Sequence, residues 1–335
     1  MLKKLLLTTT TAAIALSSAH AYEINGRGAS FPAPVYKAWA SAYYKATGNK
    51  VNYTASGSGD GIKSIEKRIV DFAGSDKPLK PKTLRKHKLY MYPAIVGSIV
   101  LAYNLDGVKD NQLKLSEKAI AAIFSGKAKY WDDKVITEYN KDLKLPHAPI
   151  NVCVRADGSG TTFNFTYYLS KIDPADFKPR KKFNWQANII GGKGNQGVTA
   201  NIQQNKNSIG YIEYSYKLQS GLPAATVENR EHKFVAPTVQ SFQDAAKYAS
   251  WDKKDDFYAV IAYPKGATSY PIVAASFILL DEEKTDVNKK VTAFYDWAFK
   301  NGADAAAKLG YVALPQATVN EIHAYWEGKG IAPAK

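Results

Sequence analysis

The first third of the chain alternates between helical and strand-like spacing of its apolar residues. At residues 35–48 one helical face is apolar, and it carries Val35, Trp39, Ala42 and Tyr43. Gly48 is a typical helix stop, and residues 49–56 then alternate apolar and polar side chains as a half-buried strand does. The pattern therefore predicts a helix followed by a strand.

The same order continues directly afterwards. Residues 61–70 have helical spacing, with Ile62, Ile65 and Ile69 on one side, and residues 71–75 (DFAGS) resemble a short buried strand. Strands that alternate with helices are typical of an α/β fold with a parallel sheet. We expect such a sheet in this part of the chain.

Two long apolar stretches, residues 92–105 and 269–280, predict strands that are buried on both faces. The spacing between them predicts a self-contained α/β region with elements at 116–126, 150–155, 161–172 and 197–205. Amphipathic helices are predicted after the second stretch, at 288–310 and 317–330.

This order predicts two domains, of which the first is discontinuous in the chain and the second is continuous. We expect a discontinuous first lobe made of residues 22–103 and 270–335, and a second lobe, residues 104–269, inserted into it. The two long apolar strands would be the segments that cross between the lobes. The chain is long enough for each lobe to have its own core.

The beginning of the chain has the order of a secretory signal peptide. Lys3 and Lys4 form a basic start, residues 5–16 are apolar, and residues 19–21 (AHA) have the small-x-small pattern of a cleavage site. No cysteine follows this site, so we expect no lipid anchor, and the segment is too short to span a bilayer. We therefore expect residues 1–21 to be removed and the rest to be exported as a soluble protein.

Charge and cysteine content narrow the possible partners. The formal net charge of +15 indicates an anionic partner, which could be a nucleic acid, a membrane surface or a small anion. The lysines are scattered, with one cluster at residues 77–88, and no nucleic-acid-binding motif accompanies them, so we expect no nucleic acid partner.

Cys153 is the single cysteine, and its apolar surroundings predict a buried, inert thiol.

Candidate chemistry lies in three short loops that each precede a predicted helix. Their small and hydroxyl-bearing residues are Ser30 and Phe31 in the first loop, Ser58 in the second, and Ser159, Gly160 and Thr161 in the third. A helix N-terminus binds anions through its free backbone N–H groups, and serine and threonine hydroxyls add further donors. Any one of these loops could be ordinary helix capping. Three of them together favour an anion site.

Two charged residues sharpen this hypothesis. Arg155 precedes the third loop and could bind an oxyanion in bidentate fashion, while Asp157 is placed to hold the guanidinium. Asp76 follows the predicted strand 71–75, where open α/β sheets bind ligands. Because a carboxylate only accepts hydrogen bonds, Asp76 would select an anion that carries a proton, as phosphate does and sulfate does not.

At four places the residues resemble one known family. Residues 28–53, 56–65 (SGSGDGIKSI), 70–79 (VDFAGSDKPL) and 155–169 (RADGSGTTFNFTYYL) closely resemble the periplasmic phosphate-binding proteins of high-affinity phosphate ABC transporters. The resemblance covers essentially all of the chain after the signal peptide. It implies a type II periplasmic binding protein fold, with two α/β lobes, two crossing segments and a ligand cleft between the lobes.

The resemblance also implies a ligand set and a biological role. Phosphate would be bound by Ser30, Phe31, Ser58, Asp76, Arg155, Ser159, Gly160 and Thr161, with Phe31 contributing its backbone N–H and Asp157 supporting Arg155. The implied protein is a periplasmic monomer that delivers phosphate to a membrane permease and needs no cofactor or metal. Ser30 replaces the threonine of many relatives, and Asp60 introduces a negative charge that the usual second loop lacks.

Other functions remain open at this stage. Residues 192–197 match G-x-G-x-x-G, but the chain shows no convincing dinucleotide-binding βαβ unit, and a tight turn into a helix is the simpler interpretation. A phosphatase is disfavoured because the histidines that follow the signal peptide have no metal-binding spacing; they are His87, His147, His232 and His323. A binding protein for another protonated oxyanion, such as arsenate, is an alternative that the residues do not separate from phosphate.

Overall fold

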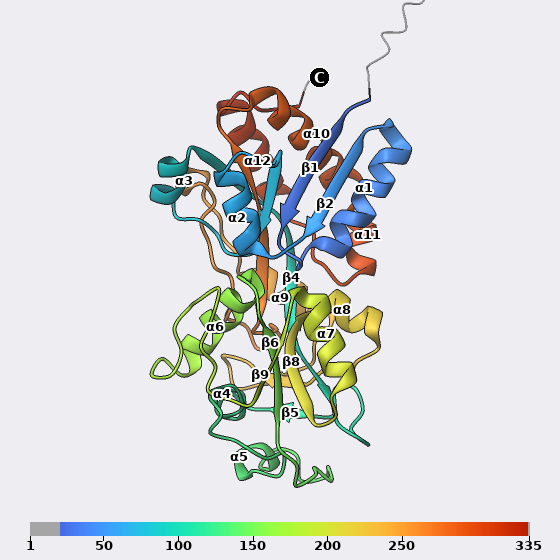
Figure 1. The fold of residues 1–335 in the computed structure, drawn as a ribbon, viewed down its shortest axis with the longest axis vertical. Helices are drawn as coiled ribbons and strands as arrows, with labels where there is room; N and C mark the ends of the chain where they lie inside the picture. Colours follow the sequence, from blue (N-terminus) through green and yellow to red (C-terminus); the bar gives the residue numbers. More distant parts are fainter. Residues whose placement is uncertain (1–20, 334–335) are drawn as a thin grey trace, which may run out of the picture.

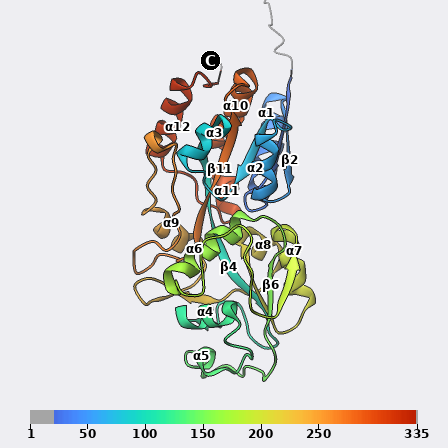
Figure 2. The same ribbon diagram turned by 60° about the vertical axis from the view of Figure 1, so that its left-hand side comes forward.

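The computed structural model describes residues 21–333, so residues 1–20 of the predicted signal peptide lie outside the described residues. The protein has two halves that lie one above the other along its long axis (Figure 1), and the same division is visible in the turned view of Figure 2. Within residues 21–333 no helix is long and apolar enough to cross a membrane.

The upper half in Figure 1 is built from both ends of the chain. Its strands are β1 (Glu23–Gly28), β2 (Lys50–Ala55), β3 (Phe72–Ser75), β11 (Val273–Asp281) and the first part of β4 (Leu89–Asn104). Its helices are α1 (Ala33–Thr47), α2 (Ser58–Glu66), α3 (Pro81–His87), α10 (Thr285–Asn301), α11 (Ala303–Lys308) and α12 (Gln316–Gly328).

The lower half comes from the middle of the chain. Its strands are β5 (Lys114–Leu115), β6 (Asn151–Arg155), β7 (Ile189–Gly192), β8 (Ser208–Glu213), β9 (Thr226–Glu228) and β10 (Phe234–Val235). Its helices are α4 (Glu117–Ser125), α5 (Lys134–Thr137), α6 (Gly160–Ile172), α7 (Gly194–Gln204), α8 (Tyr214–Ser220) and α9 (Val239–Ala246), and a 3-10 turn follows at Lys253–Asp255.

One eight-stranded sheet runs through both halves in the order β2-β1-β3-β11-β4-β8-β6-β7. The long strand β4 joins its two parts, because residues 89–98 pair with β11 and residues 99–104 pair with β8. An α/β fold was predicted and is confirmed. A small second sheet, β10-β9-β5, lies in the lower half.

The prediction of a parallel sheet holds only for part of this arrangement. Strands β1, β2 and β3 are parallel, as are β6, β7 and β8. Strands β4 and β11 run antiparallel to their neighbours. These two strands lie where the chain passes between the halves, and antiparallel neighbours need no helical crossover.

The first predicted helix is present as α1, with two differences in its buried face. Tyr36 is buried and Ala42 is exposed, whereas Val35, Trp39 and Tyr43 are buried as predicted. The centre of the buried stripe therefore lies between Trp39 and Tyr43, which leaves Ala42 at its edge. Gly48 ends the helix with φ 76°, a left-handed conformation that suits glycine.

The second predicted helix ends earlier than its apolar spacing suggested. Helix α2 stops at Glu66, and Ile69 lies beyond it with 64% of its surface exposed, so its predicted place on the buried face was wrong. Arg68 adopts a positive φ of 62°, and its side chain bonds to the Ile65 carbonyl and pairs with Asp281. These long-range contacts fix the chain in a non-helical turn before Ile69.

Three further boundaries differ from the sequence pattern. Strand β4 begins three residues earlier than the predicted stretch 92–105, and β11 begins only at Val273. The predicted helix at 288–310 is divided into α10 and α11 at Gly302. Gly302 has no room for a side chain because Trp39 packs on it and donates a 2.9 Å hydrogen bond to its carbonyl oxygen.

Aromatic side chains dominate the core of the upper half. Tyr295 of α10 makes edge-to-face contacts with Tyr36, Phe72 and Tyr92, which join two helices to the sheet. In the lower half, Cys153 is fully buried on β6, and burial raises the pKa of its thiol to about 11. The prediction of a buried thiol is confirmed, and its high pKa keeps it protonated.

Candidate anion site at the junction of the two halves

The loops singled out in the sequence meet where the two halves of the protein face each other. Ser30 and Phe31 follow β1, Ser58 begins α2, and Asp76 follows β3, all in the upper half. Arg155 ends β6 in the lower half, and its loop leads into α6. Each loop lies at the carboxyl end of a parallel strand, which is the edge where open α/β sheets bind ligands.

Ser58 links the two halves directly. Its Oγ accepts hydrogen bonds from the backbone N–H groups of Asp76 and Gly160, both at 3.1 Å. The backbone N–H of Gly59 also donates to the Gly158 carbonyl across the junction, at 2.7 Å. The halves are therefore in contact, and the predicted site residues are enclosed between them.

Gly160 lies at the tightest point of this junction. A Cβ atom at this position would collide with the hydroxyl of Ser58 and with the carboxyl group of Asp76. Only glycine allows the start of α6 to approach the upper half so closely. Its N–H, which was expected to face a ligand, is occupied by Ser58 Oγ in this arrangement.

Arg155 is held in one orientation by Asp157. Its Nε donates to Asp157 Oδ1 at 2.7 Å and its Nη2 to Oδ2 at 2.5 Å, which is a bidentate pair. The Arg155 side chain is only 1% exposed. Partial burial opposes ionisation of Asp157, but its hydrogen bonds to Arg155 and to the Gly194 N–H hold its pKa below the usual value.

The guanidinium keeps further hydrogen-bonding capacity towards the site. Its Nη1 lies 3.3 Å from Thr161 Oγ1 and makes no contact with Asp157. The fixed guanidinium therefore directs its Nη1 towards the first turn of α6. A buried cation in such a position attracts an anion to that turn.

Backbone donors surround the same point. Ser159 caps α6, since its Oγ accepts a 2.9 Å hydrogen bond from the Thr162 N–H. Among residues 21–333, the N–H groups of Phe31, Ser58 and Thr161 have no acceptor. The N–H groups of Ser58 and Thr161 belong to helix N-termini, where the dipole favours a negative charge.

Asp76 is the one carboxyl group among the predicted ligand residues. It is 2% exposed, and burial raises its pKa to about 7, although the nearby Ser276 hydroxyl, the Arg155 charge and the Ser58 hydroxyl act in the opposite direction. Its Oδ2 accepts a 3.3 Å hydrogen bond from Ser58, whereas its Oδ1 forms no hydrogen bond of normal geometry with the described residues, the Ser276 hydroxyl included. A buried, unpaired acceptor of this kind fits a ligand that donates a proton.

Comparisons with known proteins agree with this geometry. The model of a PBP superfamily domain matches residues 11–301. The phosphate-binding protein PstS of Haemophilus influenzae is 45% identical over 318 residues, which cover 93% of this chain and 95% of the relative. The chain belongs to the PstS family of phosphate-binding proteins.

More distant members and solved structures extend the comparison. The PstS protein of Methanocaldococcus jannaschii is 35% identical, over 88% of this chain and 82% of the relative. The crystal structure of a high-affinity periplasmic phosphate-binding protein, PfluDING, superposes with a TM-score of 0.72 and 20% identity, over 90% of this chain and 93% of that one. The resemblance seen in the sequence motifs and the periplasmic binding protein fold are thereby confirmed.

Asn195 is a residue of this PstS-family site that the sequence motifs did not indicate. Its backbone N–H and its Nδ2 both donate to Ser30 Oγ at 3.0 Å, and Nδ2 also lies 3.2 Å from Thr161 Oγ1. Its Oδ1 accepts a hydrogen bond from the Glu213 N–H. Asn195 thus ties the first loop of the upper half to α6 and β8 of the lower half.

Asn195 was overlooked because it lies within the glycine-rich stretch 192–197. This stretch forms the turn between β7 and α7, and Gly194 has a φ of 70°. The Gly194 N–H donates to Asp157 Oδ1 at 3.1 Å. The G-x-G-x-x-G pattern therefore marks a tight turn that supports the Arg155–Asp157 pair.

A second overlooked group is the fully buried Glu213. Burial raises its pKa to about 8, although hydrogen bonds from Ser215 and Tyr311 oppose the shift. The Tyr311 hydroxyl lies 2.6 Å from the Phe31 carbonyl and 2.9 Å from Glu213 Oε2. Since Tyr311 has one hydroxyl hydrogen, it donates to only one of these two oxygens at a time.

Asp60, the departure from the usual second loop of the family, lies away from the buried centre. Its side chain is 45% exposed and lies 3.4 Å from the Nε of Arg27. Such an exposed pair contributes little free energy. Its charge is partly balanced at the surface by Arg27.

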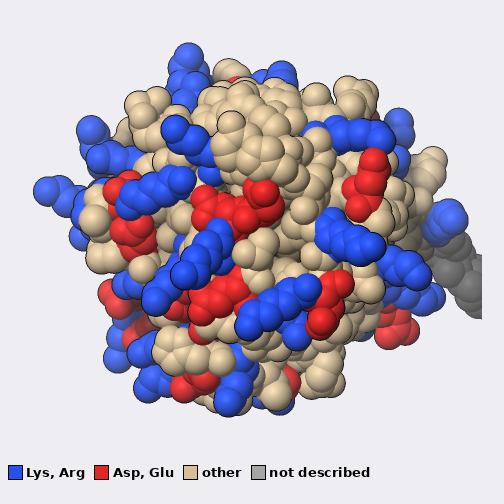
Figure 3. Space-filling model, turned by 90° about the horizontal axis from the view of Figure 1, so that it is seen from below, with Lys and Arg blue, Asp and Glu red and all other residues tan. Residues whose placement is uncertain are grey.

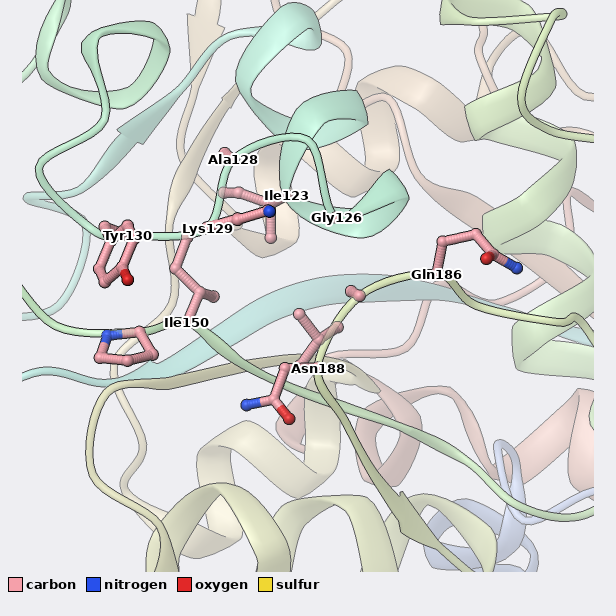
Figure 4. Close-up of a pocket in the computed structure, with 11 residues that line it drawn as sticks. Ile123, Gly126, Ala128, Lys129, Tyr130, Ile150, Gln186 and Asn188 are labelled. Carbon is pink, nitrogen blue, oxygen red and sulfur yellow. The ribbon is translucent and has the colours of Figure 1, made fainter.

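Metal ligands and alternative pockets do not compete with this site. Residues 21–333 contain no group of three or more His, Cys, Asp or Glu side chains that could hold a metal ion. A pocket of about 290 Å³ in the lower half is lined by Tyr130, Ile150 and Asn188 among others (Figure 4), and Lys129 is its one charged lining residue. None of the predicted ligand residues lines it.

Proposed function

We propose that this protein binds inorganic phosphate in the periplasm and delivers it to the membrane permease of a phosphate ABC importer. Its PstS relatives are named as phosphate-binding proteins, which supports this role. The observation that carries the proposal is the buried Oδ1 of Asp76, an unpaired acceptor within a group of hydrogen-bond donors. Phosphate is a tetrahedral anion that needs many donors and, at neutral pH, one acceptor.

The proposed ligand residues divide into three kinds. Arg155 supplies positive charge, Asp76 accepts the ligand proton, Gly160 lets the start of α6 approach the upper half closely, and the remaining residues supply N–H or hydroxyl donors. The complete proposed set is Ser30, Phe31, Ser58, Asp76, Arg155, Ser159, Gly160 and Thr161, with Asp157 fixing the orientation of Arg155. Asn195 is added as a residue that positions Ser30 and Thr161.

Selection against sulfate follows from Asp76. An ionised Asp76 accepts the hydroxyl of a protonated phosphate, whereas fully ionised sulfate brings an unprotonated oxygen to the same carboxylate. A buried acceptor without a donor costs about 1–3 kcal/mol, and more when a charge is involved. Arsenate carries a proton in the same way, so we expect it to compete with phosphate.

Closure of two lobes would complete the binding step. We propose lobes made of residues 22–103 with 270–335 and of residues 104–269, and the change of β4 partner between Ser98 and Ile99 supports a division near that point. Phosphate would enter an open cleft, and the contact between Gly59 and Gly158 would form as the lobes come together. The closed form would then dock on the permease as a monomer.

We infer a transport role without catalysis or a cofactor. The relatives are named as binding proteins, and the buried site has no histidine near Arg155 or Asp76 among the contacts that the structure describes. Cleavage of residues 1–21 would release the protein into the periplasm. Assay of phosphate release from a generic phosphate ester tests the catalytic alternative, and sustained turnover by the pure protein would contradict our inference.

Titration calorimetry with phosphate, arsenate and sulfate tests the central proposal. We expect tight binding of phosphate, competition by arsenate, and sulfate binding at least 100-fold weaker at pH 8. Because closure buries the ligand, intrinsic tryptophan fluorescence should change with the same midpoint. Absence of phosphate binding, or equal affinities for phosphate and sulfate, would refute the proposed function.

A further inference from the structure

A second pocket lies outside the contact that closes the candidate phosphate site. It has a volume of about 550 Å³ and is lined by residues from both halves. Gly59 and Asp60 line it from the upper half, and Asp157, Gly158 and the segment 179–182 line it from the lower half. Since Gly59 and Gly158 also form the hydrogen bond across the junction, this outer pocket lies at the entrance to the inner site.

Positive charge dominates this outer pocket. Five of the residues that line it are cationic, namely Lys63, Lys77, Arg180, Lys181 and Lys182. Within residues 21–333, none of the five forms an ion pair with a carboxylate. The two carboxylates of the pocket are already engaged, because Asp60 pairs with Arg27 and Asp157 pairs with Arg155.

The cations are close enough to destabilise one another. Burial lowers the pKa of Lys77, and the charges of Lys80 and Arg180 lower it further. Burial also lowers the pKa of Lys181, where Lys77 and Lys63 add to the effect and Glu66 opposes it. The five cations therefore outnumber the two carboxylates of the pocket, which are paired with Arg27 and Arg155.

The distribution of charge around the outer pocket differs from that at the lower end of the molecule. At the lower end of the molecule, Lys and Arg side chains are interspersed with Asp and Glu (Figure 3). Mixed charges of this kind largely balance each other locally. The outer pocket instead collects cations from both halves around one cavity, and its wall is fixed to α6 by a 2.9 Å bond from the Ser159 N–H to the Lys181 carbonyl.

We propose that the outer pocket is a second anion site, which binds a polyvalent phosphate anion while the inner site is occupied. An anion there would neutralise cations contributed by Lys63 and Lys77 on one side and by residues 180–182 on the other. Lys77 and Lys181 are partly buried, whereas Lys63, Arg180 and Lys182 are exposed around them, so an anion in the pocket would be attracted by several cations at once. The proposal goes beyond the binding of one phosphate ion, because it gives the protein two anion sites with different selectivity.

Selectivity should differ because the outer pocket has no buried, unpaired carboxylate corresponding to Asp76; its one buried side-chain oxygen without a partner is the Ser56 hydroxyl, which can donate as well as accept. Its contacts would come from flexible lysine and arginine side chains that adapt to the ligand. The outer pocket should therefore accept anions without a proton and anions larger than phosphate. Inorganic pyrophosphate is such a larger anion, and it is too large to replace a phosphate ion enclosed between the halves.

Titration of the phosphate-saturated protein with pyrophosphate tests this inference. We expect one pyrophosphate to bind per protein while the phosphate remains bound, observed by calorimetry and by ³¹P NMR. The triple substitution Lys63→Gln, Arg180→Gln and Lys181→Gln should weaken this binding at least tenfold. Lys77 is left unchanged because it is adjacent to Asp76, and its replacement would also disturb the inner site.

A matched control separates a built site from general attraction to a basic protein. Lys109, Lys118 and Lys144 are exposed and line neither site, so their triple replacement by glutamine removes the same charge elsewhere. Pyrophosphate affinity should then change by less than twofold. No binding to the phosphate-saturated wild type, or an equal loss in both triple variants, would overturn the proposal.

Phosphate binding is measured first on the same samples, so the two proposals fail separately. A wild-type protein that binds no phosphate would refute the inner site, and pyrophosphate titration of that protein would still test the outer pocket. A protein that binds phosphate normally but no pyrophosphate would refute the outer pocket alone.

Discussion

The inner site and the outer pocket lie on opposite sides of the contact between Gly59 and Gly158, yet they use charge in different ways. The inner site has one fully buried guanidinium, which is fixed by a carboxylate, and an unpaired buried acceptor. The outer pocket has five cations without ion pairs and no unpaired buried carboxylate, and its unpartnered buried oxygen is the Ser56 hydroxyl, which can also donate. Buried groups that match a ligand atom by atom give selectivity, whereas unpaired surface charge gives attraction with little discrimination.

Removal of Arg155 should give the largest difference between binding at the inner site and binding at the outer pocket. Arg155→Ala deletes the buried cation of the inner site and leaves Asp157 without its partner. We expect phosphate affinity to fall by about 1,000-fold or more, since loss of a buried charged partner costs about 3–5 kcal/mol. Calorimetry measures this loss, and pyrophosphate binding at the outer pocket should weaken far less, by the effect of the single Asp157 carboxylate that Arg155 no longer balances.

A conservative substitution distinguishes lost chemistry from a lost fold. Arg155→Lys keeps the charge but cannot reproduce the bidentate pair with Asp157. We expect an intermediate affinity and a melting temperature closer to that of the wild type. If Arg155→Lys bound phosphate as tightly as the wild type, the planar fork would have no role in the site.

Replacement of Asp76 should change selectivity more than total binding. Asp76→Asn keeps the shape but introduces a donor, so we expect phosphate affinity to fall about 10- to 100-fold and sulfate binding to improve. In the wild type, protonation of Asp76 below its pKa of about 7 should change selectivity in the same direction as the substitution. Sulfate should therefore bind better at pH 5.5 than at pH 8. Unchanged phosphate-to-sulfate ratios in the variant and across this pH range would contradict the role of Asp76.

Replacement of Asn195 should have a smaller effect on phosphate affinity, because this residue supports the site through other residues. Asn195→Ala removes the bonds to Ser30 and Thr161, and we expect phosphate affinity to fall about tenfold, which corresponds to about 1.4 kcal/mol. Gln204→Ala, in the same helix but exposed, is the control and should leave affinity unchanged. Equal affinities of both variants would show that Asn195 does not position the ligand groups.

The sequence allowed prediction of the residues that share a short motif with a helix start. Arg155, Asp157 and Ser159 lie within five residues of one another, so local spacing places them together. Asn195 and Glu213 could not be predicted in this way, because their partners Ser30 and Tyr311 are 165 and 98 residues away in the chain. Their contacts depend on how the two halves face each other.

The differences in the fold have the same origin. Local apolar spacing placed Ile69 in a helix, but long-range contacts of Arg68 with Asp281 and with the His87 carbonyl end that helix earlier. The direction of β4 and β11 also depends on how the chain returns between the halves. Periodicity predicts which segments form elements, while contacts between distant segments decide where those elements end and how they are oriented.

Replacement of Glu213 should cause the smallest change in phosphate binding and a clear change in the pH dependence of folding stability. The unfolded chain releases the Glu213 proton near the ordinary pKa of 4.5, whereas the folded protein retains it up to a pKa of about 8. Folding stability is therefore highest below pH 4.5 with respect to this group and falls as the pH rises through 8. Glu213→Gln keeps a neutral side chain beside Tyr311 at every pH and removes this dependence.

Chemical denaturation of the ligand-free proteins measures the effect. At pH 9 we expect Glu213→Gln to be more stable than the wild type by about 1–3 kcal/mol, relative to their difference at pH 5. Phosphate affinity should change less than twofold, because the Glu213 side chain reaches the site through Tyr311 and the Phe31 carbonyl, and its backbone hydrogen bond to Asn195 is kept in the variant. If the difference in unfolding free energy stayed constant from pH 5 to pH 9, Glu213 would not be the buried, protonated group that its contacts indicate.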